Sequence, residues 1–437
     1  MENIKTLFVG MDISLYGFNI EYLDIDSNSY SSKKNKYFLN NPTGLNSFID
    51  ELYFIALKNN FTKIKIGFEA TNNYGFHLPF YLSESPLLKK IKLDIYQINP
   101  KIIKNARKSY SEIPKTDYYD AYVIAERLKN GKLPPYTRFD PHYLALRFLT
   151  RARFDIIKKL VSLKSRFISM LFIKASSFTQ NKIFSNTLGI TSLNLLTFFD
   201  STETIANMDI NELVSFIIKY SKNHFKHPEK IAEKIKYIAR ESYTLNRIMH
   251  DSISYSLLTL FNQIKFLTRE LKQTDKQIEK TIVTFKNDFD ILNSIRGIGK
   301  VFAAGIIAEL GDLSDFTSQC AIAKFSGLMW RIRQSSKYKS EETELTKTGN
   351  KYLRYYLVEA AQSVVTHNPD FQPYYQKKYN ESTKHKHKRA ILFVARKLIR
   401  VIYSLLKNNK LYQTPNYISN YYCTLAIKPD LNMSKSI

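Results

Sequence analysis

The chain has 437 residues, 44% of them hydrophobic, and its 65 lysines and arginines exceed its 39 aspartates and glutamates, giving a net charge of +26. This length predicts about two or three domains, and the hydrophobic content excludes a disordered basic tail protein. Two cysteines are too few for a disulfide framework or a thiolate zinc site, and no apolar run reaches the roughly 18 residues that a bilayer span needs. We expect a soluble cytoplasmic protein without a membrane partner.

A/T-rich codons account for part of the lysine content but not for the scarcity of acids, so the charge favours a nucleic-acid partner.

Residues 1–138 alternate strand-like and helix-like patterns, which is typical of an α/β domain. Helical spacing of apolar residues predicts a helix over 44–58, and Thr116 is a suitable N-cap for another helix that ends near Lys129. Strands are predicted at 7–12, 16–25, 63–69 and 91–98.

Residues 139–290 follow helical patterns and predict an all-α middle region. From Leu257 to Phe285, apolar residues alternate at three- and four-residue spacing over about four heptads, which is typical of a coiled coil. An ordinary long helix packed on its own domain would show the same stripe. Residues 200–228 are less regular, and we expect a loop-rich insertion there.

Residues 291–411 predict a third, helical domain, with an apolar helix over 301–310 and amphipathic helices over 352–365 and 390–406. The last residues, 412–437, show no period and are expected to be loosely ordered.

Four acids of the first domain are candidates for metal binding. Asp12 and Glu69 each end a strand-like run, and the three-residue spacing of Asp117 and Asp120 puts both on one helix face. If the elements converge, four carboxylates would need cations, and oxygen ligands favour Mg²⁺ or Mn²⁺. Two such ions assist phosphoryl transfer on a phosphodiester. The alternative is that Asp12 and Glu69 are turn residues and that Asp117 only stabilises the N-terminus of its helix through the helix dipole.

At residues 10–14, 68–74, 99–100 and 115–121 the chain resembles the motif series of the DEDD insertion-sequence transposases, the "one-ten" family. The resemblance implies an N-terminal RNase H-like fold, as in the RuvC Holliday-junction resolvases. It also implies that Asp12, Glu69, Asp117 and Asp120 form the acidic tetrad. Asn72 departs from the family, which commonly has glycine there.

The third domain begins with a glycine-containing turn that has the form of half a helix-hairpin-helix. Its glycines would let the backbone approach a phosphate, although a plain helix-helix turn needs the same glycines. The residues expected to contact nucleic acid here are Arg296, Gly297, Gly299 and Lys300.

Segments 325–328, 331–336 and 347–354 resemble the second conserved domain of the same family, in which a serine joins DNA covalently. That serine corresponds to Ser335, with Arg331 and Arg333 as phosphate clamps. Ser336 replaces the family's glycine, so either hydroxyl could react. Because a serine needs a base or a metal to become nucleophilic, this domain would have to meet the acidic tetrad, within one subunit or between subunits. The alternative is a polar basic loop that only binds the DNA backbone.

Lysine and arginine are concentrated between Lys377 and Arg400, where Glu381 is the only acid. This charge predicts contact with a nucleic-acid backbone. The lysines alternate with His385 and His387 and disfavour a zinc ion there. The residues expected to bind are Lys384, Lys386, Lys388 and Arg389.

Together these features predict a DNA transposase or site-specific recombinase that acts on donor and target DNA. The resemblance further implies Mg²⁺, a 5′-phosphoserine intermediate, a homo-oligomer (dimer or tetramer), a noncoding bridge RNA as guide, and a location at the prokaryotic nucleoid. Two alternatives stay open: a metal-dependent nuclease or Holliday-junction resolvase that acts through water, and an inactive nucleic-acid-binding relative.

Overall fold

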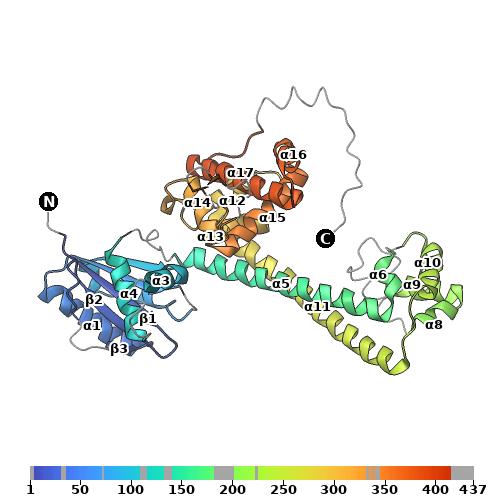
Figure 1. Cartoon of the computed structure of the whole chain (residues 1–437), viewed down its shortest axis with the longest axis horizontal. Helices are drawn as coiled ribbons and strands as arrows, with labels where there is room; N and C mark the ends of the chain where they lie inside the picture. Colours follow the sequence, from blue (N-terminus) through green and yellow to red (C-terminus); the bar gives the residue numbers. More distant parts are fainter. Residues whose placement is uncertain are drawn as a thin grey trace. The chain divides into compact units, whose positions relative to one another are not determined.

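The computed structural model describes residues 4–30, 36–70, 73–108, 116–131, 140–181, 201–221, 225–330, 334–335, 338–339 and 345–414 (Figure 1). Its contacts divide the chain into two compact units. We call residues 1–141 and 312–322 the N-terminal unit, and residues 142–311 and 323–437 the helical unit. No helix in the described ranges is long and apolar enough to cross a bilayer.

A five-stranded mixed sheet forms the centre of the N-terminal unit, in the order β3-β2-β1-β4-β5. The central strand β1 is antiparallel to β2 and parallel to β4, β2 is antiparallel to β3, and β5 is parallel to β4. Four of these strands confirm the strands predicted from the sequence, and β3 was not predicted. Their bounds are β1 Thr6–Ile13, β2 Gly17–Leu23, β3 Lys36–Leu39, β4 Lys63–Glu69 and β5 Lys92–Ile98.

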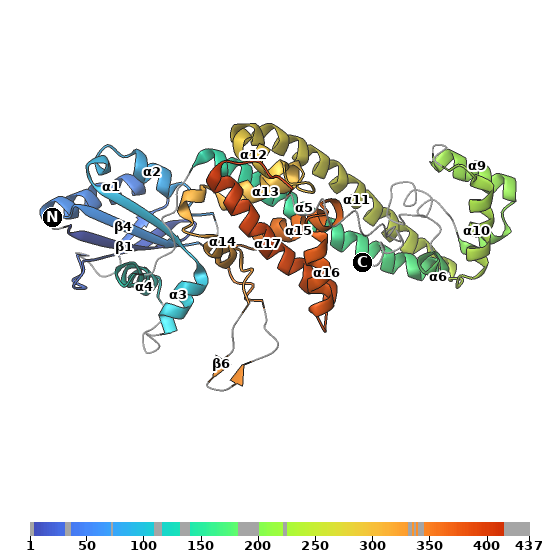
Figure 2. The same cartoon turned by 90° about the horizontal axis from the view of Figure 1, so that it is seen from above.

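Helices cover both faces of this sheet (Figure 2). On one face, Leu7, Val9 and Met11 of β1 join a core with α1 (Pro42–Lys58), α2 (Leu78–Glu84) and the 3₁₀ turn η1 (Leu88–Lys90). On the other face, Phe8 packs with buried residues of α3 (Pro100–Arg107) and α4 (Asp117–Lys129). This division follows from the alternation of side chains along a strand.

Two paired glycines allow α4 to lie directly on the sheet. Gly10 of β1 is opposite Gly67 of β4. A Cβ at Gly10 would lie 2.0 Å from the carbonyl oxygen of Ala121, and one at Gly67 would lie 2.9 Å from the Leu128 side chain. Any larger residue at position 10 would push the α4 backbone away from β1. The glycine therefore fixes how closely the helix approaches the strand that ends near Asp12.

Two long helices, α5 (Pro141–Lys174) and α11 (Arg247–Thr281), share one core in the helical unit. Leu257, Leu260 and Ile264 of α11 are buried in it together with residues of α5. An ion pair of 2.6 Å between Arg153 and Asp275 also links the two helices. The apolar stripe predicted as a coiled coil thus packs against α5 of the same chain, which favours the alternative of a helix packed on its own domain.

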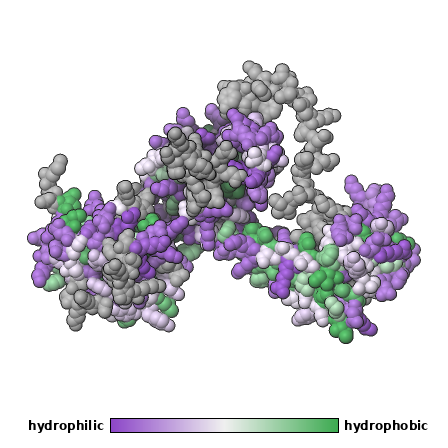
Figure 3. Space-filling view, in the orientation of Figure 1, coloured by the Kyte–Doolittle hydropathy of each residue, from purple (hydrophilic) through white to green (hydrophobic). Residues whose placement is uncertain are grey.

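Short helices pack at the far end of α5 and α11. They show that one prediction from the sequence was wrong. The loop-rich insertion expected at 200–228 is wrong for the residues described there, because Ser201 caps α8 and α9 is amphipathic, burying Leu213 and Ile217. Figure 3 shows apolar surface in this region, where Ile248 and Met249 are exposed. The helices are α6 (Ser176–Gln180), α8 (Thr202–Asn207), α9 (Ile210–Ser221) and α10 (Pro228–Arg240).

The C-terminal part of the helical unit is a layered group of helices in which α15 packs against α13 and α17. The helices predicted at 301–310, 352–365 and 390–406 are confirmed as α13, α15 and α17. Two short strands, β6 (Gln334–Ser335) and β7 (Tyr338–Lys339), pair between α14 and α15. The helices of this part are η3 (Ile282–Phe285), α12 (Lys286–Asn293), α13 (Lys300–Leu310), α15 (Lys351–His367), α16 (Gln372–Glu381) and α17 (Lys386–Asn408). The 3₁₀ turn η4 (Leu313–Asp315) and the start of α14 (Gln319–Ser326) belong to the N-terminal unit.

Candidate active site

Asp12 and Glu69 occupy equivalent places on neighbouring parallel strands. Met11 pairs with Phe68, and Asp12 and Glu69 are the next residues of β1 and β4. Because side chains alternate along a strand, both acids lie on the face that α4 covers, as Gly10 and Gly67 do. Both are half-buried. Adjacent strands lie about 4.8 Å apart, so the sheet register brings these two acids to one place at its edge.

Asp117 and Asp120 lie in the first turn of α4. The helix starts as predicted, since the Thr116 hydroxyl accepts a hydrogen bond of 3.3 Å from the backbone N–H of Tyr119. Asp117 is exposed. The Asp120 side chain is 13% exposed and forms an ion pair with Arg107, the last residue of α3. One of the four acids is therefore already neutralised by a cation of the protein.

A buried acid that sequence analysis missed anchors the start of α4. Glu21 of β2 is fully buried opposite Gly10 and accepts hydrogen bonds from the hydroxyls of Tyr118 and Ser29. Burial, together with the hydrogen bond to Glu21, raises the pKa of the Tyr118 hydroxyl well above its usual range. Tyr118 lies between the two acids of α4 in the sequence, so this contact ties their helical turn to the sheet. The sequence did contain a signal for this residue, because Glu21 is a charged residue within a strand that is otherwise mostly apolar.

The donor chemistry of the four acids fits a hard divalent cation, because carboxylate oxygens are the ligands that Mg²⁺ and Mn²⁺ prefer. The positions of the four carboxylates fit a metal ion less well than their chemistry does. Among the residues that the structure describes, no three acidic, histidine or cysteine side chains lie close enough to hold one metal ion. Binding by the whole tetrad would therefore require side-chain movement, including release of Asp120 by Arg107.

Ser335 lies at the closed end of the β6–β7 pair, opposite Tyr338. It belongs to the helical unit, whereas the four acids belong to the N-terminal unit. Arg331, Arg333 and Ser336 lie outside the described residues, as does the tail beyond residue 414.

The glycine-containing turn before α13 combines packing with exposed charge. Gly297 has φ +102°, and a Cβ there would lie 2.8 Å from the Cα of Val364, so packing against α15 accounts for this glycine. Gly299 faces open space, and Arg296 and Lys300 are exposed. Lys300 pairs with Glu279 at 3.3 Å. Phosphate contact by this turn stays a prediction.

The predicted basic stretch coincides with the start of α17. Lys384, Lys386 and Lys388 are exposed and Arg389 is half-buried. Cations at a helix N-terminus oppose the helix dipole, so this arrangement is costly for the free protein. An anion bound there would offset that cost.

The chain matches two families of known proteins. Residues 9–173 match a family described as a DEDD-type IS110 transposase, and residues 289–376 match the transposase IS116/IS110/IS902 family. An uncharacterized 44.8 kDa protein of insertion element IS116 from Streptomyces clavuligerus is 24% identical over 306 residues, which cover 70% of this chain and 74% of the relative. An uncharacterized 42 kDa protein of insertion element IS900 from Mycobacterium paratuberculosis is 23% identical over 315 residues, covering 71% and 76%.

Proposed function

Because the chain belongs to the IS116/IS110/IS902 family of transposases, we propose that it cuts and rejoins donor and target DNA through a covalent serine intermediate. The N-terminal unit would be an RNase H-like domain of the RuvC type, and its mixed five-stranded sheet supports this assignment. The observation that carries the proposal is the register of β1 and β4, which puts Asp12 and Glu69 side by side under the helix that bears Asp117 and Asp120.

These four acids would hold divalent cations, most simply Mg²⁺, which neutralise the phosphate charge and lower the barrier to its substitution. The Ser335 hydroxyl then attacks phosphorus and loses its proton. The bond from phosphorus to the 3′-oxygen breaks, and that oxygen takes up a proton, leaving a 5′-phosphoserine and a free 3′-hydroxyl. Attack of another 3′-hydroxyl on the phosphoserine rejoins DNA and returns the serine. No external energy source is consumed, because one phosphodiester replaces another.

Positive charge in the helical unit would hold the nucleic acids. Arg296, Lys300, Lys384, Lys386 and Lys388 are exposed and suit contact with phosphates. The family resemblance adds a homo-oligomer and a bridge RNA as guide, so that the serine of one subunit could act at the acids of another.

An adduct assay with a labelled element end tests the proposal. In Mg²⁺, we expect wild-type protein to form a DNA adduct that survives denaturation, and we expect Ser335→Ala to abolish it. Asp12→Asn should lower the rate of adduct formation about a thousandfold, because several kcal/mol of charge stabilisation is lost, while DNA affinity stays unchanged.

Ser336→Ala is the matched control for the serine. An adduct that persists in Ser335→Ala and disappears in Ser336→Ala would identify Ser336 as the nucleophile. Strand cleavage by wild-type protein without any adduct would instead support a nuclease or resolvase that uses water. Activity that is unchanged by Asp12→Asn would contradict the proposed role of the acids.

A further inference from the structure

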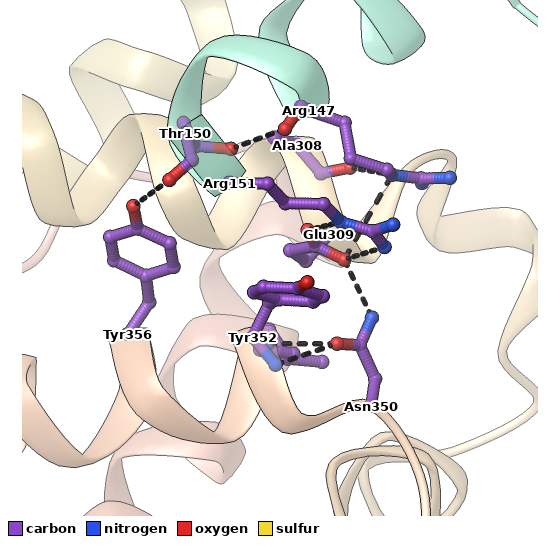
Figure 4. Close-up of polar contacts among 9 residues, drawn as sticks. Arg147, Thr150, Arg151, Ala308, Glu309, Asn350, Tyr352 and Tyr356 are labelled. Carbon is purple, nitrogen blue, oxygen red and sulfur yellow. Dashed lines mark hydrogen bonds and ion pairs between the residues drawn. The ribbon is translucent and has the colours of Figure 1, made fainter. Parts of the chain in front are cut away.

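Glu309, near the end of α13, is a fully buried carboxylate with a complete set of partners (Figure 4). It accepts two hydrogen bonds from the Arg151 guanidinium of α5, at 2.7 and 2.9 Å. A third, of 2.7 Å, comes from the side-chain amide of Asn350. Arg147, one turn before Arg151, lies 3.9 Å from the same carboxylate and donates to the carbonyl oxygen of Ala308. A buried charge is tolerated only when it is paired and hydrogen-bonded in this way.

The pKa values of the two arginines shift in opposite directions, although Glu309 acts to raise both. Burial lowers the pKa of the Arg147 guanidinium, although Glu309 acts against this shift. For Arg151, burial also acts to lower the pKa, but the hydrogen bonds and charge of Glu309 outweigh it and raise the pKa. The Arg151 guanidinium also lies over the Tyr352 ring, 4.4 Å from its centre. The bidentate Arg151 contact is therefore the principal ionic link between α5 and α13 at this point.

Asn350 connects this charge cluster to the start of α15. Its side-chain oxygen accepts hydrogen bonds from the backbone N–H groups of Tyr352 and Leu353, at 2.9 and 3.0 Å, and so caps the helix. The amide nitrogen of the same side chain must then point the other way, toward Glu309. Because both ends are used, the side chain has one orientation only.

Asn350 also closes the segment that carries Ser335, residues 327–349, which we call the serine segment. Its backbone N–H donates to the carbonyl oxygen of Phe325 at 2.7 Å. Gly327 and Gly349 have φ of +70° and +113°. A Cβ at Gly327 would lie 2.3 Å from the Thr348 oxygen, and one at Gly349 would lie 2.2 Å from the Phe325 oxygen. The two ends of the serine segment are therefore in direct contact.

Further contacts continue this closure toward Ser335. The backbone N–H of Thr346 donates a hydrogen bond of 2.7 Å to the carbonyl oxygen of Met329, and Trp330 forms a β-bridge with Leu345. The Trp330 ring stacks on Phe393 of α17, with 4.6 Å between ring centres. The base of the serine segment is thus held by backbone pairing with residues 345–346 and by stacking on the Phe393 ring. Trp330 lies four residues before Gln334, the first residue of β6.

We infer that Glu309 and Asn350 are positioning residues for Ser335, which is the nucleophile under the proposed function. Arg151 and Glu309 join α5 to α13, and Asn350 joins Glu309 to the closed base of the serine segment, where Trp330 pairs with Leu345. Adduct formation by this segment should therefore depend on the contact between α5 and α13. Neither residue touches DNA in this role.

The test uses a substitution that keeps the helix cap and breaks the link to Glu309. Asn350→Asp retains an oxygen for the Tyr352 and Leu353 N–H groups, but it turns a second carboxylate toward Glu309. We expect the rate of adduct formation to fall about a hundredfold, the cost of misplacing a reacting group by about 1 Å, with DNA affinity unchanged. Combining it with Glu309→Gln restores a donor facing the new carboxylate, and we expect this double variant to recover about tenfold of the loss.

Trp330 supplies a readout that does not depend on activity, because it is the only tryptophan in the sequence. We expect Asn350→Asp to shift its fluorescence to longer wavelength and to increase quenching by acrylamide, and the double variant to reverse both changes. The matched control is Asn246→Asp, because Asn246 caps α11 in the same way and lies outside the Glu309 cluster. It should change neither the fluorescence nor the adduct.

The outcomes separate this inference from the proposed function. Unchanged Trp330 fluorescence in Asn350→Asp, or full adduct formation by that variant, would overturn the positioning role. A fluorescence change without recovery in the double variant would also contradict it, since the effect would then not pass through Glu309. Absence of any adduct in wild-type protein would remove the proposed serine chemistry, while the fluorescence would still report whether Glu309 holds the segment.

Discussion

Asp120 in the N-terminal unit and Glu309 in the helical unit are both paired with arginine, but the two pairs differ in kind. Asp120 is half-buried and has the ion pair with Arg107, on the short helix α3. Glu309 is fully buried and is held by Arg151 and Asn350, with Arg147 nearby. The first carboxylate would exchange its partner for a metal ion under the proposed function, whereas removal of Arg151 would deprive the second, which is fully buried, of its bidentate ionic partner. The same residue types would thus supply chemistry in one unit, under the proposed function, and hold helices together in the other.

The largest effect is expected when the buried cluster is broken. Glu309→Ala leaves Arg147 and Arg151 without their counter-charge, and we expect the free energy of unfolding of the helical unit to fall by about 2–4 kcal/mol, somewhat below the usual cost of breaking a buried pair because both arginines are partly exposed. Urea denaturation followed by circular dichroism would measure it.

The control for this substitution is Glu279→Ala, which removes the exposed pair with Lys300. Exposed pairs contribute only about 0–1 kcal/mol. Equal losses in the two variants would show that Glu309 behaves as a surface residue.

An intermediate effect is expected from the exposed positive charge at the start of α17. Replacing Lys384, Lys386 and Lys388 with alanine should weaken DNA binding and reduce its dependence on salt by roughly one slope unit for each lost phosphate contact. The result would show whether exposed positive charge, unlike the arginines paired with Glu309, binds the substrate.

Fluorescence anisotropy at several salt concentrations measures that slope. A variant with Lys265, Lys272 and Lys276 of α11 replaced by alanine loses the same net charge from exposed positions and serves as the control. An unchanged slope in the α17 variant would show that this stretch does not contact nucleic acid.

The smallest effect is expected at Arg107. Removing the cation that competes for Asp120 should raise the affinity for Mn²⁺ in Arg107→Gln about fivefold, since a partly exposed pair of charges interacts by about 1 kcal/mol. Calorimetric titration with Mn²⁺ measures it, and Arg269→Gln, which affects a pair with Glu270 outside the site, is the control. Weaker binding in Arg107→Gln would contradict the competition between arginine and metal.

The positions of Asp12, Glu69, Asp117 and Asp120 on their strands and helix could be predicted from sequence because each follows a local pattern. A short apolar run marked β1 and period-two alternation marked β4, and each ends in an acid. Thr116 identified the start of α4. What the sequence could not reveal was the pairing of Asp120 with Arg107, because Arg107 is separated from Asp120 by residues without a clear pattern.

Glu309 shows the opposite case. Its partner Arg151 is 158 residues away in the sequence and Asn350 is 41 residues away, so no local pattern joins them. One signal was present, since Glu309 is the only charged residue of α13 after Lys300. The wrong prediction at 200–228 has a related cause, because the burial of α8 and α9 depends on their contacts with α10.

The contact between Gly10 and α4 has a consequence for how mutations would inactivate this enzyme. A single methyl group at residue 10 would act as a wedge beneath the carbonyl of Ala121, tilting the turn that bears Asp117 and Asp120 while leaving every acid intact. A random library screened for lost transposition should therefore recover changes at this glycine as readily as changes at the carboxylates.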